Sequence, residues 1–346
     1  MRRSGRALAP RPELARHTNF QRDAHMDAKQ ATAAVPWPVS LFASVMGLAG
    51  LSAAWRLAAR YGAPGWIGDG LAMLAWLTFL FLAGVQLRRV WSDGKTWLAE
   101  LRQPATAPFL GTFWISLLLL PMLAPPGWPA RAMWLLGAAG MVVCAWRNFL
   151  QWTAGALDEG QVSAAWLIPV VGLLDVPLAF PALGWPALRE WMLFALAAGF
   201  VLAIPVFALV FGRLVSHTPG AQPTLLILLA PFAVGFSAYV AMAGEVDALA
   251  RSLFYLDLFL LAVLLPRVYS MLRGQPFRLN WWALSFPLAA SAVAAQRYAL
   301  AMPGWFGRSV AVALLALATL AIGALAWRSL RGLARGDAMV PVPAAR

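Results

Sequence analysis

Long apolar runs separated by short polar breaks make up most of this chain. Each run has about the 20 residues that an α-helix needs to cross the roughly 30 Å hydrocarbon core of a bilayer. The pattern predicts ten transmembrane helices, at 38–58, 67–88, 107–125, 132–152, 164–182, 188–212, 224–243, 249–269, 280–300 and 306–328. We therefore expect an all-α integral membrane protein.

The polar ends of the chain bound a single predicted membrane domain. Residues 36–330 are expected to hold all ten helices, and the short loops leave no room for a second folded domain. Residues 1–35 are basic and lack an apolar run, which predicts a disordered cytoplasmic tail and not a cleaved signal peptide. Residues 331–346 are predicted to form a second cytoplasmic tail.

Charge is scarce and unevenly distributed. Hydrophobic residues make up 61% of the chain and charged residues 12%, with a net charge of +13. Twenty of the 27 basic residues flank the predicted helices on one side and seven on the other, so the positive-inside rule places both termini in the cytoplasm. Topology thus accounts for the charge without a nucleic-acid partner, although a basic arm that binds anionic lipid is an alternative. Arginine far outnumbers lysine, which is typical of proteins encoded by GC-rich bacterial genomes. We therefore expect the protein to lie in a bacterial inner membrane.

Residue types that carry catalysis or hold metals are almost absent from the predicted helices. Cys144 is the only cysteine, which excludes a disulfide within the chain. The histidines, His17, His25 and His217, all lie in the tail or a loop, so no usual axial haem ligand is available within the membrane. We therefore expect neither an enzyme nor a bound cofactor.

Prolines inside the predicted helices are concentrated in the odd-numbered ones. Proline removes a backbone hydrogen bond and disrupts the preceding turn, at a cost of about 3 kcal/mol, and lipid cannot satisfy the freed carbonyl. We therefore predict five proline-kinked inner helices around a pore, ringed by five even-numbered outer helices; the alternative is that the distribution arose by chance. The predicted kinks are at Pro121, Pro169, Pro177, Pro231 and Pro287.

Few ionisable residues lie within the predicted helices. Asp175, between two prolines of the fifth helix, is either protonated, paired with an arginine or part of a proton pathway. Asp257 in the eighth helix favours a structural hydrogen bond. Arg56, near the end of the first helix, is typical of an interfacial anchor, and Asp247 is typical of a solvated loop charge.

The ninth predicted helix carries an unusual combination of side chains. Phe286 and Arg297 are separated by 11 positions, which leaves them about 20° from the same helical face. Ala290 and Val293 lie between them on that face, and Pro287 follows the phenylalanine. This face of the helix thus carries an aromatic ring, then small or medium side chains, then an arginine. The pattern alone favours ordinary packing for Phe286 and leaves interfacial anchoring open for Arg297.

Three segments, at 35–56, 244–254 and 281–289, resemble the family of the bacterial tellurite-resistance protein TehA, the C4-dicarboxylate and malate transporters and the slow anion channels of plant guard cells. The resemblance extends in order and spacing over nearly all of residues 35–330. It implies a homotrimer in which each subunit has its own pore, formed by five inner helices.

The resemblance also implies a pore gate at Phe286, which follows Ser285 as in the family motif. Its implied neighbours are Ala43, Ser285, Pro287 and Ala290. The family has glycine at the position of Ala43, so here the ring would meet a methyl group in place of bare backbone.

Two functions remain open from the sequence. The first is passive permeation of inorganic or small dicarboxylate anions, with Arg297 attracting them to the mouth and tellurite resistance as a phenotype of permeation. The second is proton-coupled C4-dicarboxylate transport, with Asp175 as the proton site.

Overall fold

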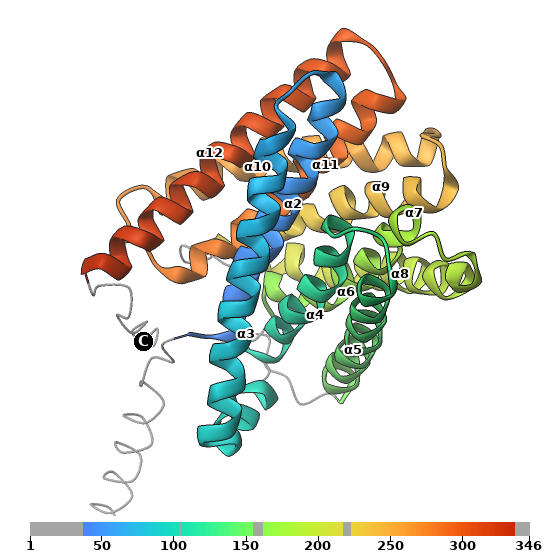
Figure 1. Cartoon of the computed structure of the whole chain (residues 1–346). Coiled ribbons are helices and arrows are strands. Elements are labelled where there is room, and N and C mark those ends of the chain that lie inside the picture. The colour runs from blue at the N-terminus through green and yellow to red at the C-terminus, as the bar shows by residue number, and fades with distance from the viewer. Residues whose placement is uncertain (1–36, 104, 155–161, 217–222, 336–346) are drawn as a thin grey trace, which may run out of the picture. The chain divides into compact units, whose positions relative to one another are not determined.

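Ten apolar helical segments follow one another along the chain (Figure 1). The computed structural model describes residues 37–103, 105–154, 162–216 and 223–335, and every regular element in these ranges is helical, which confirms the predicted all-α class. The α-helices of the ten segments are α2 (Phe42–Ala58), α3 (Gly65–Arg102), α4 (Leu110–Leu119), α5 (Trp128–Thr153), α6 (Leu167–Asp175) with α7 (Phe180–Leu183), α8 (Arg189–Ser216), α9 (Ala230–Ala243), α10 (Ala248–Leu272), α11 (Ser285–Ala301) and α12 (Trp305–Arg335).

Length and composition suit eight of the described segments to crossing a membrane. The third segment, Ala107–Leu123, is apolar but shorter. The ninth, at 279–301, is not among the eight and includes the polar residues Gln296 and Arg297.

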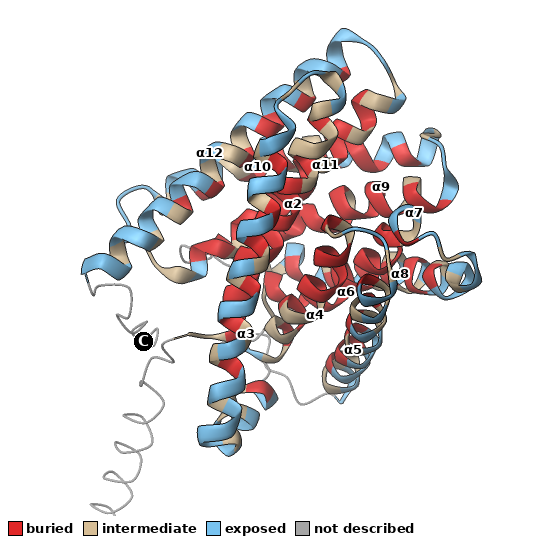
Figure 2. Ribbon diagram, viewed as in Figure 1, coloured by how far each residue is buried: buried red, intermediate tan, exposed pale blue. Residues whose placement is uncertain are grey.

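The described segments fall into two classes by burial (Figure 2). In the first, fifth and seventh segments, 78%, 83% and 83% of an apolar stretch of 18 residues is buried. In the even-numbered segments the buried share is only 28% to 39%, and their exposed faces carry large apolar side chains such as Leu320 and Ile204. Such faces suit contact with lipid or another apolar surface. The prediction of odd helices inside and even helices outside is confirmed.

Each predicted kink proline lies beside a junction between a 3₁₀ turn and an α-helix. Proline offers no N–H for the α-helical bond to the carbonyl four residues earlier, so the chain tightens into 3₁₀ geometry there. Pro205 and Pro266, in the outer helices α8 and α10, leave the α-helix uninterrupted. The five inner positions are Pro121 in the turn Leu120–Leu123, Pro177 in the turn Val176–Ala179, and Pro169, Pro231 and Pro287 in the first turns of α6, α9 and α11.

Small residues allow α2 and α11 to approach each other closely. A Cβ atom added to Gly47 would stand 2.3 Å from Ser285 Oγ, and one added to Gly50 would stand 2.9 Å from Ala289 Cβ. The Ser285 hydroxyl also lies 3.0 Å from the carbonyl oxygen of Ala43. This contact fixes the position of the residue after Ser285, which is Phe286, relative to α2.

Two helices extend well beyond their predicted ends. α3 continues past residue 88 to Arg102, with a break at Asp93, where φ is −153° and ψ is 65°. An ion pair of 2.8 Å between Arg89, before the break, and Glu100, after it, joins the two parts of α3. α12 continues to Arg335, into the predicted C-terminal tail. Residues 336–346, the predicted N-terminal tail and the three histidines lie outside the described residues.

The turn before α10 corrects the prediction for Asp247. Its carboxylate caps the helix by accepting a hydrogen bond from the backbone N–H of Ala250 at 2.9 Å. It also accepts a hydrogen bond from the Tyr239 hydroxyl at 2.6 Å. Both bonds favour the ionised form, the amide of Ala250 most strongly, and hold the pKa of Asp247 below its ordinary value. Asp247 therefore joins α9 to α10 and is not a free loop charge.

Candidate functional site

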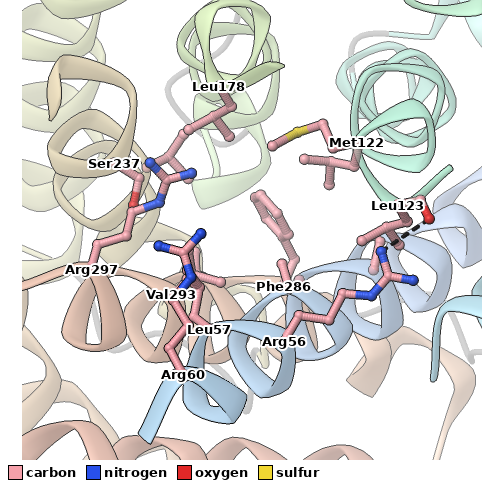
Figure 3. A pocket seen from close by; sticks show the side chains of 16 residues that line it. Arg56, Leu57, Arg60, Met122, Leu123, Leu178, Ser237, Phe286, Val293 and Arg297 are labelled. Atoms are coloured by element: carbon pink, nitrogen blue, oxygen red, sulfur yellow. Dashed lines mark hydrogen bonds between the residues drawn. The ribbon is translucent and has the colours of Figure 1, made fainter. Parts of the chain in front are cut away.

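All five inner segments surround a cavity of about 210 Å³, which we call the arginine vestibule (Figure 3). Three arginines, Arg56, Arg60 and Arg297, stand in a wall that is otherwise almost entirely apolar. The lining residues are Ala49, Gly50, Ala53, Arg56, Leu57, Arg60, Leu119, Met122, Leu123, Leu178, Val234, Ser237, Phe286, Ala290, Val293 and Arg297.

The same five segments surround a second space of about 30 Å³, which we call the inner cavity. It has room for no more than about two water molecules. Its one polar side chain, Thr112, lies within hydrogen-bond distance of the carbonyl oxygens of Val39 and Phe109. The lining residues are Ala43, Met46, Phe109, Thr112, Ile115, Ile168, Val171, Ile227, Ala230, Ala283, Phe286 and Pro287.

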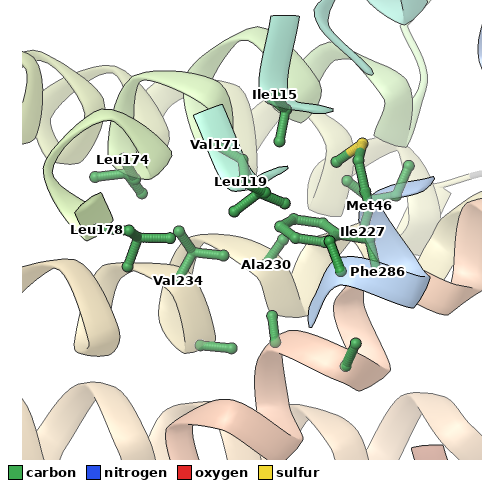
Figure 4. Close-up of a cluster of buried hydrophobic side chains, with 14 of the residues drawn as sticks. Met46, Ile115, Leu119, Val171, Leu174, Leu178, Ile227, Ala230, Val234 and Phe286 are labelled. Atoms are coloured by element: carbon green, nitrogen blue, oxygen red, sulfur yellow. The ribbon is translucent and has the colours of Figure 1, made fainter. Parts of the chain in front are cut away.

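Phe286 is the residue that these two linings share. Its side chain is 6% exposed and lies among apolar side chains, including Met46, Ile227 and Ala230 (Figure 4). The two cavities follow each other along α11, with the ring between their linings.

The predicted neighbours of Phe286 lie on both sides of the ring. Ala43 and Pro287 line the inner cavity, and Ala290 lines the arginine vestibule. Ser285 is fully buried, and its hydroxyl is 3.0 Å from the Ala43 carbonyl of α2. It also lies 2.7 Å from the Trp282 carbonyl, in the turn before α11. Ser285 thus holds the helix in place and does not itself line either cavity.

The three arginines differ in their partners. Arg56 forms a 2.9 Å ion pair with Asp69 and donates to the carbonyl of Leu123 at 3.0 Å. Arg297 and Arg60 have neither an ion pair nor a hydrogen bond with any described residue, and Arg297 Nε is buried without a partner. Their guanidinium groups lie together beside the Phe286 ring, with Arg56 on the other side (Figure 3).

Helical spacing singles out Arg297, but the sequence gives no role at this site to Arg56 or Arg60. The sequence favours an interfacial anchor for Arg56, which the structure places in the vestibule wall. A signal was present, because residues four apart on a helix share a face. The sequence did not reveal that this face meets α11.

The two membrane carboxylates have different surroundings. Asp257 is fully buried and accepts a hydrogen bond from Ser291 of α11 at 2.9 Å, which confirms its predicted structural role. Asp175 is also fully buried, but neither of its oxygens has a hydrogen-bond partner among the described residues. It lines neither the arginine vestibule nor the inner cavity.

No potential metal centre is found within the described ranges, where no three histidine, cysteine or acidic residues cluster. Cys144 is buried, and its nearest polar partner is Asn148.

Comparison with known proteins covers the whole helical domain. A family model described as SLAC1, voltage-dependent anion channel, matches residues 37–330. The S-type anion channel SLAH3 of Arabidopsis thaliana is 25% identical over 84% of this chain and 47% of its own length. The guard cell S-type anion channel SLAC1 of the same plant is 25% identical over 82% and 53%. An uncharacterized transporter of Methanocaldococcus jannaschii is 28% identical over 62% and 69%.

The chain spans about half the length of these plant relatives. The matched region contains the first nine helical segments, most of α12 and every residue that lines the two cavities. The resemblance inferred from the sequence is thereby confirmed, and the chain belongs to the voltage-dependent anion channel family.

Proposed function

We propose that this protein is a passive anion channel whose pore runs along the five inner segments and is closed by the Phe286 side chain. The observation that carries the proposal is that one aromatic ring belongs to the walls of both cavities. Small inorganic anions or small dicarboxylates are the proposed permeant ions, and tellurite resistance would follow from such permeation.

The electrostatics of the two cavities support this function. Three arginines and no carboxylate line the vestibule, so it raises the local concentration of anions. The inner cavity offers no charge to an ion, and a dry apolar constriction stops conduction by occlusion or dewetting. An anion thus meets attraction before the ring and a barrier at it.

The proposed setting follows from the charge distribution and the exposed outer helices. Both termini are proposed to be cytoplasmic in a bacterial inner membrane, which puts the arginine vestibule on the outer side. Three copies are proposed to associate through the even-numbered helices, each copy keeping its own pore. Surrounding lipid would cover the remaining apolar faces.

Phe286→Ala tests the gate. The purified variant, reconstituted into liposomes or planar bilayers, is expected to conduct anions well above the wild-type level, because truncation joins the two cavities. Phe254→Ala is the matched control: Phe254 is fully buried but lines neither cavity, so its truncation costs about 3–5 kcal/mol of stability without raising conductance.

If Phe286→Ala lowers the melting temperature as Phe254→Ala does and leaves conductance at the wild-type level, the ring is only a packing residue. Conductance and melting temperature are measured on the same preparation, so a misfolded variant is recognised directly.

The second candidate function is proton-coupled dicarboxylate transport, and the observation that favours it is the buried, unpartnered carboxyl group of Asp175. Its position outside both cavity linings favours the channel. For a channel, Asp175→Asn should leave anion flux equal or higher, because it removes no attraction from the pathway. Loss of flux together with loss of the response to a pH gradient would support the transporter.

A further inference from the structure

Arg60 and Arg297 form a pair of like charges, and no carboxylate among the described residues forms an ion pair with either. Arg60 lies in the 3₁₀ turn Ala59–Tyr61 after α2, and Arg297 lies on α11. Both residues line the arginine vestibule, where their guanidinium groups lie near each other (Figure 3). The ion pairs within the described residues join Arg56 to Asp69, Arg89 to Glu100 and Arg189 to Glu190, and none includes either member of this pair.

An anion between the members of such a pair would relieve their repulsion, most of all at Arg297, which is the less exposed of the two. Like charges repel, and a buried charged group without a partner also loses its hydration. Arg297 Nε is shielded from solvent and makes no hydrogen bond to the described protein. Arg56, in the same wall, has both an ion pair and a carbonyl acceptor, so the lack of partners is specific to Arg60 and Arg297.

The cavity beside this pair has the chemistry of a binding site. Each guanidinium group presents several N–H donors in a flat fork, which matches two oxygens of one anion better than it matches a spherical halide. Apolar residues such as Leu57 and Val293 form the adjacent wall. This wall excludes water and strengthens charge-assisted hydrogen bonds.

We infer that Arg60 and Arg297 together bind one oxyanion in the arginine vestibule, with a preference for nitrate-like or carboxylate groups over chloride. The inference rests on the proposed function, because the bound oxyanion would be a permeant ion held on the outer side of the Phe286 gate. One bound oxyanion replaces the repulsion between two guanidinium groups by two attractions. The site concentrates oxyanions next to Phe286 and sets the concentration at which flux saturates.

The test measures binding without conduction. The purified protein in detergent at low ionic strength is titrated with sodium nitrate, sodium succinate or sodium chloride, and thermal unfolding is followed, because a ligand of the folded state raises the melting temperature. Nitrate and succinate are expected to stabilise the wild type at lower concentrations than chloride at matched ionic strength. R60Q and R297Q should each weaken oxyanion affinity about 10-fold or more, the loss typical of a charge-assisted hydrogen bond.

Two further variants isolate the cause. R251Q removes an exposed arginine that does not line the vestibule, and it should leave the affinity unchanged. R60K keeps the charge but loses the flat fork, so it should retain chloride binding and lose the preference for oxyanions. Arg60 is exposed, so R60Q and R60K report on the site even if R297Q fails to fold.

Equal stabilisation by all three salts, wild-type affinity in R60Q, or an unchanged oxyanion preference in R60K would each overturn the inference. Liposome flux is measured separately on the same variants. The flux measurement uses the Phe286→Ala background, in which the proposed gate is removed. Flux without oxyanion binding rejects this site but leaves the channel standing, whereas binding without flux in that background rejects the channel and keeps the site.

Discussion

Gly47→Ala tests how closely the helix that carries Phe286 must pack against α2. The added methyl carbon would lie 2.3 Å from Ser285 Oγ and 2.5 Å from Ser285 Cβ, far inside the roughly 3.5–4.0 Å of favourable contact. Rotation of the serine hydroxyl cannot relieve the clash, because the Cβ atom is also too close. α2 and α11 must therefore separate, at a cost of about 1–3 kcal/mol that is typical of overpacking.

The assay is thermal and denaturant unfolding of the purified variant beside two companions. Gly70→Ala is the matched control, since Gly70 also lies inside a helix but has no heavy atom within 4 Å of an added Cβ. It should be neutral or stabilising by up to about 1 kcal/mol, because alanine favours a helix over glycine. Ser285→Gly should rescue Gly47→Ala, because the nearest remaining atom would be the Ser285 carbonyl carbon at 3.3 Å.

Equal stability of Gly47→Ala and Gly70→Ala would refute the reasoning, because it would mean that α2 and α11 are not in close contact. A destabilised Gly47→Ala that Ser285→Gly fails to rescue would assign the cost to another neighbour. Conductance is recorded on the same samples, since separation of the two helices also moves the Phe286 ring relative to Ala43.

Other predictions concern the polar contacts and the topology. Asp247→Ala should lower the melting temperature at neutral pH; because the pKa of Asp247 is depressed in the folded state, this contribution is complete above pH ~4. As the pH falls further through the folded pKa, wild type and variant should converge, and a constant difference would argue against the cap. Ser291→Ala should lower the free energy of unfolding by about 1–3 kcal/mol, because it leaves the Asp257 carboxyl group without its partner. An unchanged unfolding midpoint would contradict this prediction. Reporter fusions at residue 30 and residue 335 should both report a cytoplasmic location. A periplasmic signal from either fusion would mean that the number of membrane-spanning helices is wrong by at least one.

Much of the fold was readable from the sequence because the bilayer imposes a simple rule. A helix must be apolar and about 20 residues long to span the hydrocarbon core, so ten runs predicted ten segments in the right places. The uneven prolines also separated inner from outer helices, since a broken hydrogen-bond ladder is tolerated where other helices surround it. The sequence did not predict the break at Asp93 or the continuation of α12 to Arg335. Hydropathy identifies apolar helices and does not predict where a helix continues through polar residues.

The candidate site was only half determined by the sequence. Phe286 and Arg297 could be placed on one helical face, because the spacing of residues on a single helix is fixed by its geometry. That Arg60 and Arg297 line the same cavity, and that Phe286 belongs to the walls of two cavities, depends on how α2 and α11 pack. Periodicity within one helix carries no information about the rotation of its neighbours, so only the tertiary structure could bring these side chains together.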